Sequence, residues 1–158
     1  MKEAISNSLI LAIIITFFTV FIILFAGSTS YTKAFKVKNK IVSIIEKYDS
    51  IVAESGITED IMAKIDKELG EMGYRTVRNN DMKCENAMKN RFKNQKYSLV
   101  NLKSNTYRYC IAEFVDQREE KHGKYYAVIA YMYFEVPLIG TDLEFPVYGE
   151  TKVIGMTY

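Results

Sequence analysis

Histidine and cysteine are scarce in this sequence of 158 residues, which has one histidine and two cysteines. Two distant cysteines and one histidine supply too few ligands for a zinc centre. His122 lies in the charged stretch "QREEKHGK", where we expect an exposed turn residue and no general base. The G-x-S-x-G, P-loop, G-x-G-x-x-G and H-E-x-x-H motifs are absent as well. We therefore expect no catalytic residue, no cofactor, no metal and no small-molecule substrate, which indicates a protein that is not an enzyme.

An excess of charge of one sign is also missing. The sequence has 21 Lys and Arg residues against 19 Asp and Glu residues, a net charge of +2. Without residues 1–26, which hold Lys2 and Glu3, the counts are 20 and 18, again +2. A nucleic-acid surface needs clustered basic charge. We therefore expect no nucleic-acid partner.

One long apolar run stands out near the N-terminus. Leu9 to Ala26, "LILAIIITFFTVFIILFA", contain no charge, proline or glycine. A helix of this length is about 27 Å long, close to the ~30 Å hydrocarbon core of a bilayer. We favour a retained transmembrane helix in the cell membrane with the lipid bilayer as partner, and its packing residues are Leu9, Ile13, Phe17, Val20 and Leu24.

Two alternatives for this run stay open. A cleaved signal peptide is one, because Ala26, Gly27 and Ser28 supply small residues after the run. A buried core helix is the other, although a chain of this size has little protein to surround it.

The side of the membrane on which the C-terminal part lies is not settled by the residues. Lys33, Lys36, Lys38 and Lys40 follow the run closely, and the positive-inside tendency alone would place this part in the cytoplasm. Cys84 and Cys110 favour the other side, because a single pair suits a disulfide in an oxidising compartment. Two cysteines that are not bonded to each other remain the alternative.

Helical periodicity continues beyond the apolar run. Apolar residues recur at steps of three and four, which predicts one rod from about residue 4 to 54. The stripe that packs on the core is Val37, Ile41, Ile44, Tyr48 and Ile51. Ser55 and Gly56 end this helix, and Thr58 is the expected N-cap of a second one over 58–72 that Gly70 and Gly73 end.

Strand-forming residues dominate the last third of the chain. Segments 106–116, 124–138 and 144–156 are rich in Tyr, Val, Ile and Phe, and short connections predict antiparallel neighbours. Segment 79–105 shows no alternation and is expected to be irregular, with a helical turn near residues 85–91. The predicted fold is α+β: a long N-terminal transmembrane helix that continues as a spine packed on a C-terminal antiparallel sheet of three to four strands. Residues 1–28 form the leader and transmembrane helix, and residues 29–158 form a head with helices 29–54 and 58–72 and strands within 106–156.

This arrangement resembles a known family. The stretches "VKNKIVSIIEKY", "FEVPLIG" and "YGETKVIGM", together with the leading helix, are similar to TadE-like minor pilins, or pseudopilins, of Gram-positive tight-adherence (Flp-type) loci. The resemblance implies a membrane-spanning helix, an extracellular head, and other pilin or pseudopilin subunits and an assembly platform as partners. It also implies a role in starting or decorating an adhesive filament.

The sequence departs from the family at the processing site. Prepilin-type processing recognises a glycine before the apolar segment, whereas the first glycine here is Gly27, after it. We therefore expect the helix to stay in the bilayer. The alternatives to a pilin-like role are a membrane-anchored adaptor with a cytoplasmic head and a secreted binding module.

Overall fold

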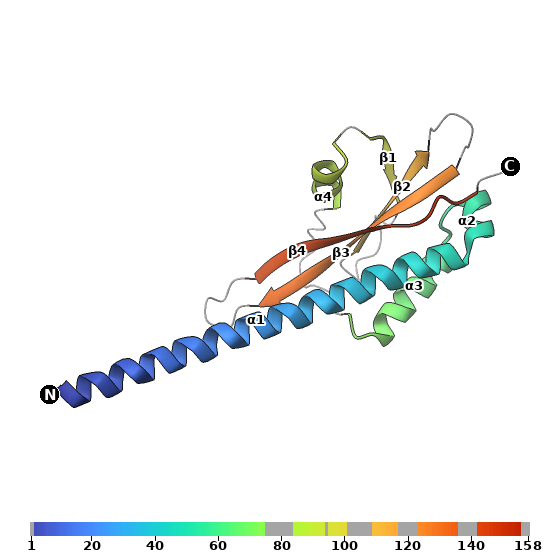
Figure 1. Ribbon diagram of the computed structural model, residues 1–158. Coiled ribbons are helices and arrows are strands. Elements are labelled where there is room, and N and C mark those ends of the chain that lie inside the picture. The colour runs from blue at the N-terminus through green and yellow to red at the C-terminus, as the bar shows by residue number, and fades with distance from the viewer. Residues whose placement is uncertain are drawn as a thin grey trace.

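The computed structural model describes residues 2–74, 84–93, 95–100, 109–116, 123–135 and 142–155. The helices are α1 (Lys2–Lys47), α2 (Asp49–Ser55), α3 (Glu59–Glu71) and α4 (Cys84–Arg91). The strands are β1 (Tyr97–Leu99), β2 (Tyr109–Asp116), β3 (Gly123–Glu135) and β4 (Asp142–Glu150). The first half of α1 extends away from the rest of the chain, and its second half lies along the sheet (Figure 1).

The sheet has four strands in the order β1-β2-β3-β4, and all neighbours are antiparallel. The predicted α+β fold, with a long helix on an antiparallel sheet of three to four strands, is confirmed. β1 lies inside the segment 79–105 that the sequence marked as irregular, so that prediction is wrong for residues 97–99. The expected helical turn near residues 85–91 is confirmed as α4.

Two apolar layers cover the two faces of the sheet. On one face Val37 and Ile41 of α1, together with α3, pack against Ile111 and Val128. On the other face Met88 of α4 packs with the alternate residues of β2 and β3, which are Cys110, Ala112, Phe114, Ala127, Ile129 and Tyr131. Because both faces of β2 and β3 are covered, these strands are apolar on both sides.

The spine is interrupted at Tyr48. The N–H of Tyr48 is shared between the carbonyls of Ile44 and Ile45, at 3.3 and 3.2 Å, and α2 begins one residue later. After this break, in α2, Val52 is fully buried while Ile51 is 46% exposed. The predicted packing of Ile51 on the core, and the single rod as far as residue 54, are therefore wrong.

Helix α3, which the sequence predicted over residues 58–72, is ended by a glycine as expected. Gly73 has φ +60°, its N–H donates to the carbonyl of Gly70, and the N–H of Tyr74 donates to the carbonyl of Leu69. This pair of bonds is a Schellman motif, which satisfies carbonyls at the helix C-terminus. Thr58 occupies the N-cap position with extended backbone, although its side chain makes no capping hydrogen bond. Both α3 ends thus agree with the prediction to within a residue.

Candidate functional site

The protruding half of α1 is the most distinctive surface of the molecule. The five residues predicted to pack in the membrane segment are 50–67% exposed: Leu9, Ile13, Phe17, Val20 and Leu24. No part of the apolar window in this helix is buried by the head. This exposure argues against the core-helix alternative, because nothing in the described chain covers the run. The helix is long and apolar enough to cross a membrane, and the chain is compatible with a single-pass membrane protein.

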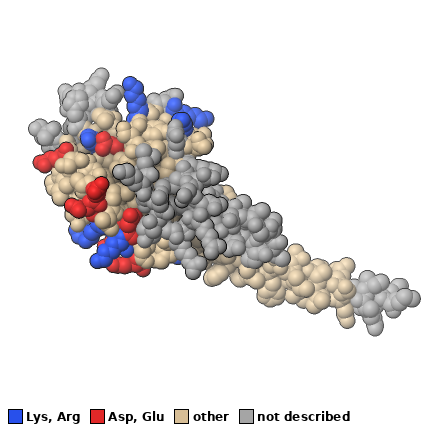
Figure 2. Space-filling model, turned by 180° about the vertical axis from the view of Figure 1, so that it is seen from behind, with Lys and Arg blue, Asp and Glu red and all other residues tan. Residues whose placement is uncertain are grey.

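One of the two threonine hydroxyls within the apolar run is satisfied by the helix itself. The hydroxyl of Thr16 donates to the carbonyl of Ala12 at 2.9 Å. Beyond the run, Thr29 and Thr32 donate in the same way to Phe25 and Ser28. A hydroxyl that bonds to the backbone of its own helix is not an unmet donor in hydrocarbon. Figure 2 shows that the described part of the protruding helix has no charged side chain, whereas both signs of charge are interspersed over the head.

The stripe of α1 that follows the run connects it to the head. Val37 and Ile41 are fully buried, Ile44 is 6% exposed, and Tyr48 packs against the same cluster while partly exposed. One continuous helix therefore carries the apolar run at one end and the centre of a hydrophobic core at the other. Four of the five predicted stripe residues occupy this interface.

The four lysines after the run have different surroundings. Lys40 forms an ion pair with Glu68 of α3, with 3.0 Å between Nζ and Oε2. The hydrogen bond from Lys40 and its charge lower the pKa of Glu68 below its usual range. The Lys38 ammonium lies 4.2 Å from the centroid of the Phe35 ring. Lys33 and Lys36 are exposed and form no ion pair with any residue that the structure describes.

The two cysteines form a disulfide. Cys84 of α4 and Cys110 of β2 are bonded, with Cα atoms 5.7 Å apart, and both side chains are buried. The bond fixes α4 to the sheet face opposite α1. Behind it, Phe114 packs with Phe92, Tyr97 and Tyr125, with ring centroids 4.8–5.6 Å apart. The residues thus have the geometry of a structural disulfide set in an aromatic cluster.

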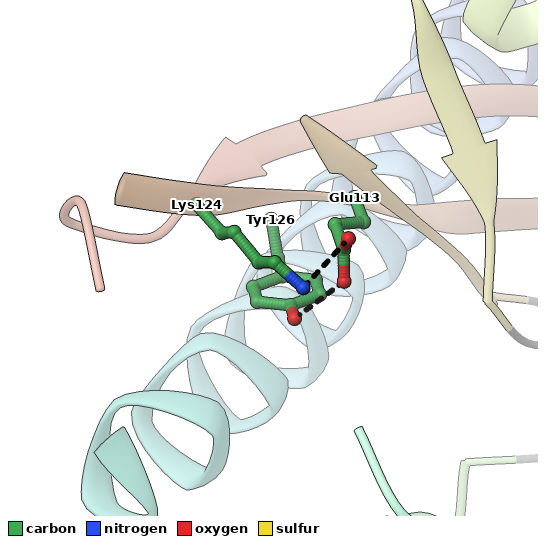
Figure 3. A network of polar contacts seen from close by, with 3 residues as sticks. All are labelled: Glu113, Lys124 and Tyr126. Carbon is green, nitrogen blue, oxygen red and sulfur yellow. Dashed lines mark hydrogen bonds and ion pairs between the residues drawn. The ribbon is translucent and has the colours of Figure 1, made fainter. Parts of the chain in front are cut away.

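One polar network lies on the sheet close to Gly56, in the turn from α2 to α3. Figure 3 shows its three side chains, Glu113, Lys124 and Tyr126. The hydroxyl of Tyr126 donates to Oε2 of Glu113 at 2.8 Å, and Nζ of Lys124 lies 3.2 Å from Oε1. Burial raises the pKa of the Tyr126 hydroxyl well above its ordinary value, and the hydrogen bond to Glu113 adds to this. The two donors, the Tyr126 hydroxyl and the Lys124 ammonium group, each meet one oxygen of the Glu113 carboxylate. Such mutual satisfaction is typical of a structural network.

The sequence did not reveal this network. Glu113, Lys124 and Tyr126 are ordinary strand residues, and only the register that pairs Glu113 with Tyr126 brings them together. A register is set by contacts across strands and leaves no local signal.

The geometry yields no catalytic or metal constellation among the described residues. No group of three or more His, Cys, Asp or Glu side chains within them is placed to hold a metal ion. His122 lies outside the described residues. No protein-family model, curated protein or solved structure matches the chain.

Proposed function

We propose that this chain is a non-enzymatic, single-pass membrane protein that acts as a minor-pilin-like or pseudopilin-like component of a tight-adherence pilus or a related secretion assembly. The observation that carries the proposal is the continuity of α1, whose apolar half has no contact with the head and whose other half is the main helix of its core. Such a helix couples events in the bilayer to the position of the head. A subunit that must join an assembly through its membrane helix needs this coupling.

Lateral packing in lipid is the first requirement of that role. Apolar side chains surround the protruding helix on all sides, so that it can contact copies of itself or related helices. In lipid such contacts depend on van der Waals fit, because hydrocarbon tails are as apolar as the side chains. The apolar run therefore serves both as anchor and as the surface that meets other subunits.

The disulfide supports an extracellular head. A bond between Cys84 and Cys110 persists where thiols are oxidised and is rare in the cytoplasm. The opposing argument from four lysines is weakened, because Lys40 forms an ion pair with Glu68 of α3 and the stem of Lys38 lies against Gly149 of β4. Two exposed lysines, Lys33 and Lys36, remain for the positive-inside tendency, and they favour a second candidate, a membrane-anchored adaptor with a cytoplasmic head.

Labelling of engineered thiols distinguishes the two candidates. Ser50 is exposed on α2, at the far end of the head, and Asn7 is exposed just before the apolar run. Ser50→Cys is expected to react with a membrane-impermeant thiol reagent on intact cells, and Asn7→Cys only after the cells are opened. The native cysteines are buried and bonded to each other, so the parent chain, labelled in the same way, gives the background signal. The reverse pattern would support the cytoplasmic adaptor.

The assembly role is tested inside the membrane. A photo-crosslinking residue in place of Phe17, which is 66% exposed at the middle of the run, is expected to capture other membrane helices in cells of the native host. Ile51, 46% exposed on α2, is the matched control position outside the run. Identification of pilin-like subunits or a polytopic platform protein in the Phe17 adducts would support the proposal. Adducts with lipid alone would contradict it.

A further inference from the structure

Two aromatic side chains mark the point where the apolar run meets the head. Tyr31 and Phe35 lie one turn apart on α1, are 53% and 43% exposed, and stack with ring centroids 6.4 Å apart. They follow Ala26 by five and nine residues, which is about 7.5 and 13.5 Å along the axis. Side chains on a helix incline toward its N-terminus, so both rings lean toward the apolar run. The polar region of a bilayer is about 5–8 Å deep on each side of the hydrocarbon, so Tyr31 lies within it, and the Phe35 ring, one turn further and leaning back toward the run, lies at its outer edge.

Exposed basic side chains occupy the same turns. Lys33 and Lys36 are exposed and form no ion pair with any described residue, in contrast to Lys40 with Glu68. The side of α1 that the head covers is marked by Ala34 and Val37, which are 1% and 0% exposed. The aromatic and basic side chains therefore occupy the part of the helix surface that the head leaves open.

We propose that Tyr31, Lys33, Phe35 and Lys36 form a collar that binds the anionic phospholipid headgroups of the bilayer that α1 crosses. The Tyr31 ring, with its apolar body and polar hydroxyl, is of the kind favoured at the membrane interface, and Phe35 stacks on it and adds apolar surface. Lysines reach phosphate oxygens there while their aliphatic stems remain near the acyl boundary. The collar is continuous with the apolar run, and its charge is complementary to that of the headgroups.

The collar fixes how the head is held above the membrane. Lys38 contacts the Phe35 ring from the head side, and a Cβ added at Gly149 of β4 would overlap the stem of Lys38. The chain of contacts therefore runs from the collar through Lys38 to the sheet, so that docking of the collar would set the orientation of the head. This inference rests on α1 crossing a bilayer. It does not depend on the side of the membrane or on a role in pilus assembly.

The absence of tryptophan from the sequence allows a direct test. In the full-length chain reconstituted in vesicles, Phe35→Trp places a single fluorophore in the collar, and Ile51→Trp places one on α2, at a position of similar exposure far from the run. We expect the collar fluorophore to emit at shorter wavelength than the α2 fluorophore, to be quenched by lipids labelled near the headgroup, and to be protected from acrylamide. Protection should increase from phosphatidylcholine to phosphatidylglycerol-containing vesicles and decrease at high salt.

A charge-matched pair of variants tests the lysines. In the Phe35→Trp background, Lys33→Gln with Lys36→Gln should abolish the extra protection in anionic vesicles. Lys47→Gln with Lys96→Gln removes the same charge from exposed positions nearer the far end of the head and should retain it. A collar fluorophore as accessible to acrylamide as the α2 fluorophore in both kinds of vesicle would overturn the collar. If protection of the collar fluorophore from acrylamide were the same in vesicles with and without anionic lipid, the assignment to anionic headgroups would be overturned. It would also be overturned if both double variants changed this protection equally.

Discussion

The hydroxyl of Tyr74 bonds both backbone polar groups of Tyr131. It donates to the Tyr131 carbonyl at 3.0 Å and lies 3.2 Å from the Tyr131 amide nitrogen, which donates to it. β2 begins at Tyr109, opposite Ala130, so that Tyr131 is the first residue of β3 past the start of that strand. The Tyr74 side chain, which follows α3, thus bonds the backbone of β3 just beyond the first residue of β2.

Removal of this hydroxyl tests how strongly α3 is tied to the sheet. Tyr74→Phe keeps the ring in the core but deletes two buried hydrogen bonds, and we expect the free energy of unfolding to decrease by about 1–3 kcal/mol. Tyr48→Phe is the control, because Tyr48 packs on the same cluster and its change should be within about 0.5 kcal/mol. Denaturant unfolding of the full chain in detergent micelles measures both. Equal losses for the two variants would assign the effect to ring packing.

The turn between α2 and α3 depends on a glycine. Gly56 has φ +70° and ψ −163°, a combination essentially restricted to glycine. A Cβ there would be 3.7 Å from Oε2 of Glu113, which is an ordinary contact, so the cost of a side chain comes from the backbone. Gly56→Ala should lower the free energy of unfolding by about 1–3 kcal/mol.

Gly27→Ala is the matched control for this substitution. Gly27 lies within α1, and a Cβ there meets nothing within 4 Å, so alanine should leave stability unchanged or raise it by up to about 1 kcal/mol. The measurement is denaturant unfolding of both variants beside the parent. A Gly27→Ala variant that loses as much stability as Gly56→Ala would show that the positive φ is not the cause.

The disulfide should contribute substantially to stability. Cys84 and Cys110 are 26 residues apart, and closure of a loop of this size in the unfolded chain corresponds to about 3–4 kcal/mol in the chain-entropy treatment. We expect the free energy of unfolding of the double variant Cys84→Ser with Cys110→Ser to be lower than that of the parent by this amount, so that it unfolds at a lower denaturant concentration. The parent treated with a reductant should match it. A reductant that lowers the stability of the double variant too would show that it acts elsewhere.

Tyr126 should make the head sensitive to alkali. Its pKa is raised in the folded chain by burial and by the hydrogen bond to Glu113, so the neutral form is the one that the fold favours. The sign follows directly: this contribution is complete below the unfolded-state pKa of about 10 and is lost as the pH rises from there through the higher folded-state pKa. The free energy of unfolding should then fall by at most about 1.4 kcal/mol per pH unit from this group.

Comparison of two tyrosine variants isolates this contribution. Tyr126→Phe should flatten the fall in stability above pH ~10, whereas Tyr31→Phe, on the exposed surface of α1, should keep the slope of the parent. Unfolding curves at a series of alkaline pH values give the slopes. Identical slopes for the parent and Tyr126→Phe would refute the proposed burial effect.

Patterns confined to one element were readable from the sequence. The apolar run, the three-and-four spacing through Val37 and Ile41, and the end of α3 at Gly73 each depend on neighbours within a few residues. The three long strands were recognisable because β-branched and aromatic residues accumulate in them. These features explain why the class of fold was predicted correctly.

Features that depend on distant contacts were not readable. β1 has only three residues, too few to show alternation, and it exists through its pairing with β2. The apolar spacing continues equally well through Ile51 and Val52, and only the packing of α2 on the rest of the head shows that Val52 is the buried one. The Glu113–Lys124–Tyr126 network depends on a strand register in the same way. In each case the outcome depends on contacts between elements that are distant in the sequence, which a local pattern does not contain.

A charge in the apolar run tests whether α1 spans a bilayer. Phe17 is near the middle of the run, and an arginine there costs about 2.5–3.5 kcal/mol on insertion scales, so Phe17→Arg should reduce the membrane-inserted fraction. Ile51→Arg, at an exposed position of the head, should leave insertion unchanged. The measurement is the fraction of the full chain that stays with membranes through an alkaline carbonate wash. If Phe17→Arg and the parent were retained equally, the run would not lie in hydrocarbon, because a central charge there could not be accommodated at no cost.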